Sequence, residues 1–277
     1  MRVLVVGAGT MGRWFGGLVD ARVAFADADP AAADRAAAAV DDAETAPLDP
    51  NDAAANADAD GARFDVVCVA VPMTVAPDVI APQASRATSA VVDVAGEMGG
   101  PVSAMREHAP DLERLSLHPL FAPENAPGSI AAVHDQPGPV TDALRDSLAA
   151  SGNDVFDTTV DEHDTAMESV QAATHAAILA WRLATDDVRE EFHTPLSREL
   201  ADLAAHVTRQ EPRVYADIAD RYAAGRHALA DAVARLADAD HDAFLDAFAD
   251  ASERAHDATD TAHDATDTTH DDVTDHR

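Results

Sequence analysis

The chain has 277 residues, 47% of them hydrophobic, and 19 basic against 51 acidic side chains give a formal net charge of −32. This length is sufficient for two modest domains with separate cores. All basic residues are arginine, and lysine is absent. The excess of acid argues against a nucleic-acid partner, because such binding requires basic side chains that neutralise phosphates. The lack of lysine excludes Schiff-base chemistry and a lysine general base.

The acidic, lysine-free composition is similar to that of cytoplasmic proteins from organisms that accumulate salt. Molar salt shortens the Debye length to about 3 Å and screens the self-repulsion that such a surface has in dilute buffer. No apolar run reaches about 18 residues and no charged-then-apolar leader is present, so we expect a cytoplasmic protein without membrane contact. The single cysteine, Cys68, lies in an apolar run and cannot form an internal disulfide.

The first half of the chain alternates short apolar runs with helical stretches. Strands are predicted at residues 2–6, 22–26, 64–71, 90–94, 115–117 and 155–156, and helices from Gly12 to about residue 19, at 30–40 and at 140–150. This alternation indicates βαβ units. We therefore expect an α/β fold, with a Rossmann-type, doubly wound, mostly parallel sheet in a dinucleotide-binding domain at residues 1–159. Residues 49–61 are rich in Asp, Ala and Asn and predict an acidic surface loop.

Strand signals stop after about residue 159. One helix is predicted from residue 161 to about 184, and two or three more follow up to about residue 254. We expect residues 160–254 to form a helical substrate and dimerisation domain. A domain this small rarely buries enough surface alone, which predicts a homodimer.

The C-terminal residues 255–277 contain a seven-residue repeat. No position of the repeat is strongly apolar, so it lacks the seam of a coiled coil. Its composition predicts an acidic disordered tail. The alternative is a cluster that collects metal ions through His256, His263 and His270.

A glycine fingerprint, Gly7-x-Gly9-x-x-Gly12, directly follows the first predicted strand and opens a helix. In a dinucleotide site the first glycine makes the turn, the second lets the backbone approach the pyrophosphate, and the third lets helix and strand pack. The phosphates then lie at the helix N-terminus, beside Thr10 and Met11.

An acidic residue, Asp27, ends the second predicted strand, 20 residues after Gly7. A carboxylate at this place binds the ribose hydroxyls and repels a 2′-phosphate, which predicts NAD rather than NADP. Asp29 is the alternative for this role, or it is the cap of the helix that begins at Pro30.

His118 lies in the stretch Ser116-Leu-His-Pro-Leu-Phe-Ala-Pro123, between a predicted strand and a loop rich in Pro and Gly. Ligands of doubly wound sheets bind outside the carboxyl ends of the strands. Histidine is also the side chain that exchanges protons near neutral pH, with an ordinary pKa near ~6.5. We therefore predict that His118 acts on substrate; a surface or hydrogen-bonded loop histidine is the alternative.

His175 lies in the predicted helix after residue 161, within the apolar stretch 172–179. It shares a polar stripe of one helix face with Glu168, Gln171 and Arg182. The stretch is too apolar for a solvated face. His175 is therefore either a substrate contact or a buried, hydrogen-bonded residue.

Arg198 is predicted in the first turn of a helix capped by Thr194 and begun by Pro195. A cation there opposes the helix dipole and does not stabilise the helix. A guanidinium beside free backbone N–H groups instead makes a strong carboxylate site. The alternative is an ion pair with a nearby acid, namely Glu190, Glu191 or Glu199.

Over roughly residues 2–250, the chain resembles the prephenate/arogenate dehydrogenase family of tyrosine biosynthesis. The matching motifs are the glycine loop from Val6, Ala70-Val-Pro72, Leu117 to Pro123, Glu162 to Gln171 leading to His175, residues 194–200 and residues 210–217. The resemblance implies transfer of a hydride to NAD from the ring carbon that bears the 4-hydroxyl. The ring carboxylate is lost as CO2, which gives 4-hydroxyphenylpyruvate from prephenate or tyrosine from arogenate.

The resemblance also implies roles for single residues. His118 is the base for the 4-hydroxyl, Arg198 binds a substrate carboxylate, and His175 is a second catalytic-site contact. Val71 and Pro72 border the cofactor, and no metal is implied.

One segment departs from the family. Members often carry a Ser and a Lys after the strand that ends near Asp93, where this chain has Gly96-Glu97-Met98. The departure leaves two alternatives open. One is an oxidoreductase for another small carboxylate, and the other is a non-catalytic homologue that binds NAD.

Overall fold

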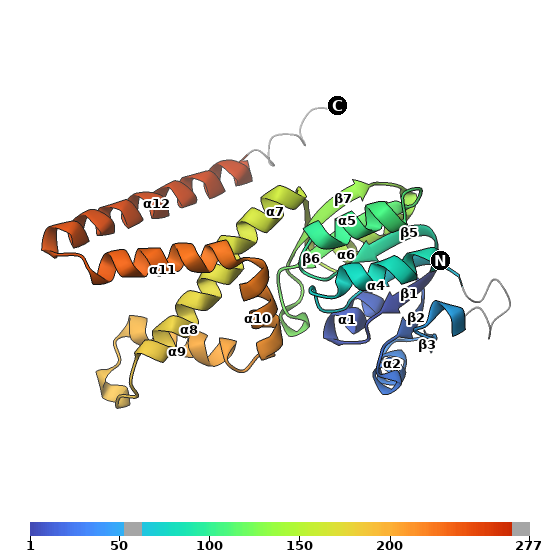
Figure 1. The fold of residues 1–277 in the computed structure, drawn as a ribbon, viewed down its shortest axis with the longest axis horizontal. Helices are drawn as coiled ribbons and strands as arrows, with labels where there is room; N and C mark the ends of the chain where they lie inside the picture. The colour runs from blue at the N-terminus through green and yellow to red at the C-terminus, as the bar shows by residue number, and fades with distance from the viewer. Residues whose placement is uncertain (53–62, 268–277) are drawn as a thin grey trace, which may run out of the picture.

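The computed structural model describes residues 1–52 and 63–267, and an eight-stranded sheet lies in the half of the molecule formed by the N-terminal part of the chain (Figure 1). The strands are β1 (Arg2–Val6), β2 (Arg22–Ala26), β3 (Glu44–Thr45), β4 (Phe64–Val69), β5 (Ala87–Asp93), β6 (Glu113–Pro119), β7 (Ser129–Gln136) and β8 (Asp154–Asp157). Their order is β3-β2-β1-β4-β5-β6-β7-β8. The strands from β3 to β6 are parallel, whereas β7 runs antiparallel to β6 and β8 runs parallel to β7. The predicted α/β, doubly wound, mostly parallel sheet is confirmed.

Helices cover both faces of this sheet. They are α1 (Thr10–Leu18), α2 (Pro30–Ala37), α4 (Ala76–Gln83), α5 (Gly99–His108) and α6 (Pro139–Ala150). Successive side chains of a strand point to opposite faces. In β1, Val3 and Val5 accordingly share one core with Phe15 of α1, while Leu4 shares the other with Ile80 of α4. Burial on both faces explains why these strands read as continuous apolar runs.

The rest of the described chain is helical. Its elements are α7 (Val160–Met167), a π-helical segment (Glu168–Ala173), α8 (Thr174–Ala184), α9 (Pro195–Val207), α10 (Pro212–Arg221), α11 (Ala223–Ala237) and α12 (His241–Asp267). Met167, Ala172, Ile218 and Tyr222 form a small buried cluster in this region. At Gly225 in α11, a Cβ atom would collide with the backbone carbonyl of Glu168. The absence of a side chain at Gly225 therefore lets α11 pack directly on the π-helical segment.

Several segments differ from the sequence-based prediction. Strands β3 and β7 were not predicted, and the helix expected from residue 161 to about 184 contains the π-helical segment. Of the predicted disordered tail, residues 255–267 continue α12, and residues 268–277 lie outside the described residues. Once a helix has nucleated, each further residue adds a hydrogen bond without a new nucleation cost. Of the predicted acidic loop, residues 53–61 lie outside the described residues, as do the side chain of His263 and all of His270.

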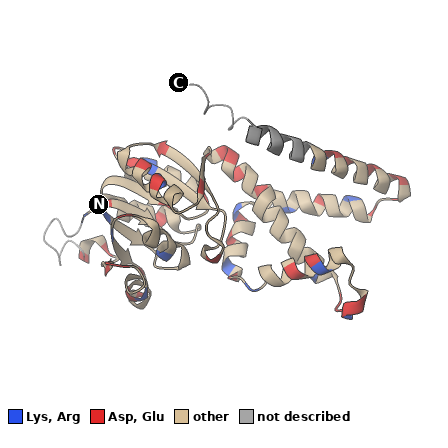
Figure 2. Ribbon diagram, turned by 180° about the vertical axis from the view of Figure 1, so that it is seen from behind, with Lys and Arg blue, Asp and Glu red and all other residues tan. Residues whose placement is uncertain are grey.

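Acidic side chains are spread over both the sheet and the helical part rather than gathered in one stripe (Figure 2). No helix in the described part of the chain has the length and apolar character needed to span a membrane.

Candidate active site

The glycine loop lies between β1 and α1. A Cβ atom on Gly7, which has a φ of +103°, would collide with the carbonyl of Ala70, and one on Gly12 would collide with the carbonyl of Gly7. A Cβ atom on Gly9 would meet nothing within 4 Å. Gly7 and Gly12 therefore serve the close packing of the loop, whereas Gly9 leaves its backbone open to a ligand. This division of roles fits a pyrophosphate at the N-terminus of α1.

The two acidic residues after β2 have different roles. The carboxylate of Asp27 accepts hydrogen bonds from the backbone N–H of Ala8, at 2.7 Å, and of Asp29, at 2.8 Å. Asp29 accepts from the N–H of Ala31 and caps α2, as one of its two predicted roles requires. Asp27 thus borders the glycine loop directly, and Asp29 serves the helix.

The other predicted cofactor contacts border the same loop. Thr10 and Met11 begin α1, and Val71 and Pro72 directly follow β4, the neighbour of β1 in the sheet. A Cβ atom on Gly7 would lie 3.0 Å from a methyl group of Val71.

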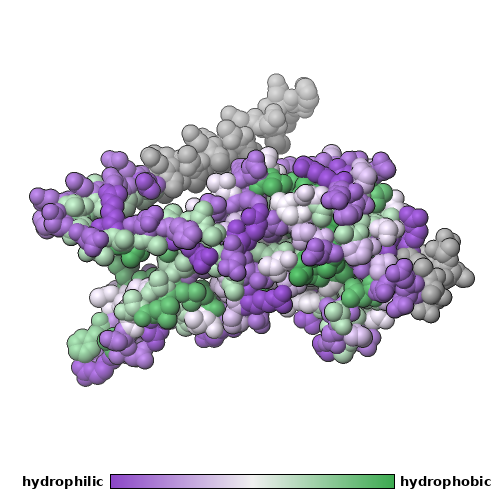
Figure 3. All heavy atoms as spheres, viewed as in Figure 1, coloured by the Kyte–Doolittle hydropathy of each residue, from purple (hydrophilic) through white to green (hydrophobic). Residues whose placement is uncertain are grey.

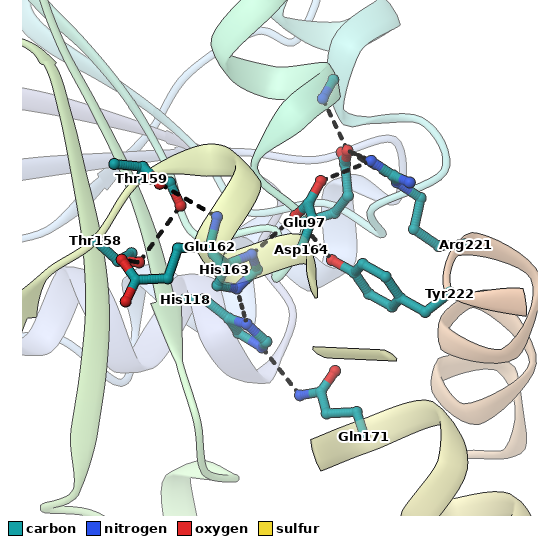
Figure 4. Close-up of polar contacts among 11 residues, drawn as sticks. Glu97, His118, Thr158, Thr159, Glu162, His163, Asp164, Gln171, Arg221 and Tyr222 are labelled. Carbon is teal, nitrogen blue, oxygen red and sulfur yellow. Dashed lines mark hydrogen bonds and ion pairs between the residues drawn. The ribbon is translucent and has the colours of Figure 1, made fainter. Parts of the chain in front are cut away.

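His118 lies near the end of β6 and is buried, with 7% of its surface exposed. Its Nδ1 lies 2.8 Å from Nε2 of His163 in α7, and its Nε2 lies 3.3 Å from the amide nitrogen of Gln171 (Figure 4). Gly96, with a φ of +83°, passes close by, since a Cβ atom there would lie 3.2 Å from His118 Nε2. The three contacts fix the ring from both nitrogen atoms.

The environment of His118 favours its neutral form. Burial lowers the pKa of His118 to about 3; a positive charge on His163 lowers it further when that ring is protonated, while Asp164 acts in the opposite direction. The sequence-based expectation of an ordinary pKa near ~6.5 is corrected accordingly, because a charged imidazole loses its hydration when it is buried. Neutral His118 has one nitrogen with a free electron pair, as a base requires.

Behind His163 lies a cluster of charged side chains (Figure 4). Asp164 Oδ1 lies 2.9 Å from His163 Nδ1, and Asp164 Oδ2 accepts a 2.8 Å hydrogen bond from Arg221. Arg221 also donates to Glu97 Oε1 through Nε and Nη2, at 3.0 and 2.8 Å. The hydroxyl of Tyr222 donates to Asp164 Oδ1 at 3.3 Å. Burial opposes ionisation of Asp164, but the bond from His163 and the charge of Arg221 outweigh it and hold its pKa below the ordinary value.

The two other predicted site residues have different surroundings. His175 is half-buried in α8, packs edge-on against Tyr215 with ring centroids 4.6 Å apart, and has no partner for its buried Nδ1 in the described part of the chain. Burial lowers the pKa of His175. Arg198 lies in the first turn of α9, after the Thr194 cap, and forms a 3.1 Å ion pair with Glu190. The structure thus shows the ion-pair alternative for Arg198, without a contact to the described residues around His118.

Several site residues were not among those predicted, namely Glu97, His163, Asp164, Arg221 and Tyr222. The sequence carried one usable signal for His163. It lies in the segment from Glu162 to Gln171, one of the motifs that carry the resemblance to the dehydrogenase family. Arg221 and Glu97 are 124 residues apart, and no local pattern connects them.

Comparison with known proteins supports the class that the geometry defines. No family model matches the chain. A 4-amino-4-deoxyprephenate dehydrogenase from Streptomyces pristinaespiralis is 33% identical over 270 residues, which cover 90% of this chain and 88% of the relative. The fold is shared with a prephenate dehydrogenase from A. aeolicus in complex with hydroxyphenyl propionate and NAD+, with a TM-score of 0.66 at 14% identity over 97% of this chain and 98% of that chain. An arogenate dehydrogenase from Synechocystis has a TM-score of 0.57 at 14% identity, over 97% of this chain and all of that one.

The glycine loop at the switch point of a doubly wound sheet, with a buried histidine at the carboxyl end of β6, is the arrangement of a dehydrogenase. The similarity to the Streptomyces enzyme over nine-tenths of the sequence makes the assignment narrower. The chain belongs to the prephenate/arogenate dehydrogenase family.

Proposed function

We propose that this protein catalyses the NAD-dependent oxidative decarboxylation of prephenate or arogenate, with His118 as the base for the 4-hydroxyl. The observation that carries the proposal is the neutral, buried imidazole of His118 at the carboxyl end of β6. The edge-on contact of Trp14 in α1 with Phe121, three residues after His118, keeps the glycine-loop helix beside this site.

NAD is the cofactor, and when bound it accepts the hydride from C4 of the ring. The carboxylate of Asp27 at the glycine loop favours the free ribose hydroxyls of NAD over a 2′-phosphate. The A. aeolicus enzyme of the same fold was solved with NAD+.

His118 takes the proton of the 4-hydroxyl through Nε2 as the hydride leaves the same carbon. The bond from the ring to its carboxylate then breaks, CO2 departs, and the electron pair of that bond makes the ring aromatic. The proton held on His118 returns to the phenolic oxygen, so that the reaction takes up no net proton. Orientation of the substrate and a placed base are sufficient for this chemistry, because aromatisation supplies the driving force.

Polar groups without partners can bind the rest of the substrate. Gln171 Oε1 and His175 Nδ1 are both buried and lack a hydrogen-bond partner among the described residues. A buried polar atom without a partner is costly, so a ligand that pairs with it gains affinity. Arg198 binds a substrate carboxylate in exchange for Glu190, to which it is bound across an exposed ion pair of little intrinsic strength.

A second candidate substrate carries an amino group at C4, as in the substrate named for the Streptomyces relative. Gly96 places no side chain beside His118 Nε2, and Gln171 Oε1 nearby is unpartnered. An amino group has two N–H donors, one for His118 Nε2 and one for Gln171 Oε1, whereas a hydroxyl has a single O–H donor. This observation favours 4-amino-4-deoxyprephenate as the alternative substrate.

We also propose a homodimer formed through the helical region. Large apolar side chains on α8, α9, α12 and the turn before α9 are exposed, among them Leu183 (87%), Leu196 (73%), Phe248 (68%) and Phe192 (67%). Figure 3 shows apolar surface over this part of the molecule. Exposed apolar area of this kind marks an interface, and a second copy covers like with like in a two-fold arrangement. Light scattering in molar KCl tests the proposal: a dimer that Leu196→Glu converts to monomer supports it, and a monomeric unmutated protein overturns it.

The acidic, lysine-free surface belongs to the same proposal, as the adaptation of a cytoplasmic enzyme to concentrated salt.

The activity is tested by absorbance at 340 nm with NAD and each of the three substrates in about 2 M KCl. Reduction of NAD with one of them, and its loss in His118→Asn, is the expected result. NAD binding without turnover of any substrate would identify a non-catalytic homologue instead. Turnover of another small hydroxy acid in place of these substrates would support the wider oxidoreductase alternative.

A further inference from the structure

The contacts of His118 form a chain of three ionisable side chains. Asp164 Oδ1 faces His163 Nδ1 at 2.9 Å, and His163 Nε2 faces His118 Nδ1 at 2.8 Å. The two imidazole rings meet edge-on, with centroids 5.1 Å apart, and the side chain of His163 is 1% exposed. Water therefore has no access to the nitrogen atoms between them. Each hydrogen bond in the chain must have one donor and one acceptor from these groups alone.

The carboxylate at the end of the chain sets the direction of every bond. Asp164 is ionised, because the bonds from His163 and Arg221 hold its pKa low, and an ionised carboxylate only accepts. His163 must then carry its proton on Nδ1, and when neutral it offers a bare Nε2. When His163 is neutral, His118 must in turn donate through Nδ1–H to that bare nitrogen, which leaves its own Nε2 without a proton.

The surroundings of His118 Nε2 agree with this direction. The amide nitrogen of Gln171, which only donates, lies 3.3 Å from it, an arrangement that suits an Nε2 without a proton. Gly96 passes on the same side and supplies no hydroxyl or other side-chain group to orient the ring. Among these neighbours, His163 is the group that faces Nδ1 of His118 and sets the proton there.

Asp164 is itself held by the helices around it. Arg221 at the end of α10 donates to Asp164 and to Glu97, and Tyr222 donates to Asp164. Glu97 is held in turn by the backbone N–H of Gly100, at 2.8 Å from Oε1. The carboxylate of Asp164 is thus fixed in position by residues from three places: the loop after β5, α7 and the end of α10.

We propose that His163 and Asp164 are positioning residues that lock His118 in the tautomer whose Nε2 is free to take the substrate proton. Neither residue touches the substrate; both act through His118. The inference rests on the proposed role of His118 as the base, but the tautomer itself is measurable without any substrate.

The first experiment reads the tautomer directly. The full-length protein is labelled with 15N-histidine and its imidazole 1H–15N correlations are recorded near pH 7.5 in molar KCl. Because the chain has 13 histidines, the signals of His118 and His163 are assigned by their loss in His118→Asn and His163→Gln. We expect neutral His118 with its proton on Nδ1. A proton on Nε2 overturns the proposal, whether or not the enzyme turns over prephenate. The expected tautomer without turnover leaves the proposal standing and contradicts the proposed function.

The second experiment separates positioning from packing by two substitutions at one site. Gln in place of His163 keeps an oxygen that can accept from His118 Nδ1–H and an amide that can donate to Asp164, whereas Leu keeps neither. We expect His163→Leu to lower kcat at least about 10-fold and to change KM little. The loss of kcat should not exceed the roughly 10²–10⁴-fold loss expected when a general base is removed. His163→Gln should recover most of that loss.

A merely structural role gives another pattern. Equal losses of kcat in His163→Gln and His163→Leu, or changes confined to KM and thermal stability, would overturn the proposal. If His163→Leu does not fold, the tautomer in the unmutated protein and the kcat of His163→Gln still decide the question.

Discussion

Arg221 and Glu97 join the two halves of the molecule through a forked ion pair. Arg221 at the end of α10 donates to Oε1 of Glu97 in the loop after β5, through Nε at 3.0 Å and Nη2 at 2.8 Å. The side chain of Glu97 is only 5% exposed. The pair thus holds the helical region against the sheet, next to Asp164 and His163.

We expect Glu97→Gln to lower the free energy of unfolding by about 1–3 kcal/mol, because the substitution weakens charge-assisted hydrogen bonds to a buried acceptor. The matched control is Asp187→Asn, which removes a 91% exposed partner of Arg182 and should change stability by less than about 0.5 kcal/mol. Chemical denaturation in about 2 M KCl measures both. Equal effects of the two substitutions would contradict a structural role for Glu97.

Burial of Asp93 at the end of β5 gives stability a pH dependence that can be isolated. Burial, together with the charge of Glu97, raises its pKa to about 8, although the N–H of Ala95 favours the ionised form. The folded state therefore holds a proton that the unfolded state releases near pH 4. The contribution of Asp93 is present in full below about pH 4 and is lost as pH rises toward 8.

Asp93→Asn mimics the protonated carboxyl at every pH. We expect the stability of this variant relative to the unmutated protein to increase between about pH 4 and 8, by up to about 1.4 kcal/mol per pH unit, and then to level off. Thermal unfolding at constant salt across this range measures the difference. A difference independent of pH would show that Asp93 ionises normally in the folded protein.

The net charge of −32 predicts that the thermal stability of the protein depends on salt concentration. Screening of the self-repulsion should raise the midpoint of thermal unfolding substantially between about 0.1 M and 2 M KCl. Calorimetry in KCl solutions at constant pH is the measurement. A midpoint that is constant or falls with salt would contradict the salt-adapted surface.

The position of Asp27 predicts cofactor preference. The unmutated enzyme should have a higher kcat/KM with NAD than with NADP, and Asp27→Ala should narrow the gap by removing the ribose contact and the repulsion of a 2′-phosphate. Asp29→Ala is the control, because Asp29 caps α2 and should leave the ratio unchanged. Equal kcat/KM for both cofactors before substitution would rule out this role of Asp27.

The lowered pKa of His118 predicts that kcat does not fall on the acid side of its pH profile through protonation of this residue. Since burial lowers its pKa to about 3, the imidazole stays neutral throughout the physiological range. We expect kcat to be independent of this group between about pH 5.5 and 8, and His118→Asn to lower kcat roughly 10²–10⁴-fold with KM little changed. A limb centred near pH 6.5 that disappears in His118→Asn would show an ordinary pKa in the working enzyme. A near-normal kcat in His118→Asn would exclude His118 as the base.

Substitution of Arg198 should change KM, in contrast to substitution of His118, which should change kcat. If it binds a substrate carboxylate alike in the ground and transition states, Arg198→Gln raises KM by a margin equivalent to about 1.5–3 kcal/mol and changes kcat little. The measurement is steady-state kinetics of both variants. Glu190→Gln is the matched comparison, because it frees the guanidinium of Arg198 from its ion pair without removing it. An unchanged KM in Arg198→Gln would leave Arg198 as a surface ion pair.

The alternation of apolar runs with helical stretches was sufficient to predict the parallel part of the sheet. The structure confirms strands at residues 2–6 and 22–26 and places His118 at the end of β6. These features could be predicted because they depend on local sequence patterns. Strand β7 was missed since two of its four buried residues are the small residue alanine, and its position depends on antiparallel pairing with β6. The stabilisation that a strand gains from its partner leaves little trace in its own sequence.

The sequence by itself therefore determined the fold class, the glycine loop and the candidate base, which all depend on residues close together in the chain. Only the tertiary structure decided what surrounds that base. It brought His163 of α7 to within 2.8 Å of His118, 45 residues earlier, and Arg221 to Glu97 across 124 residues. It also lowered the pKa of His118, because burial depends on everything that packs around a side chain rather than on its neighbours in the chain.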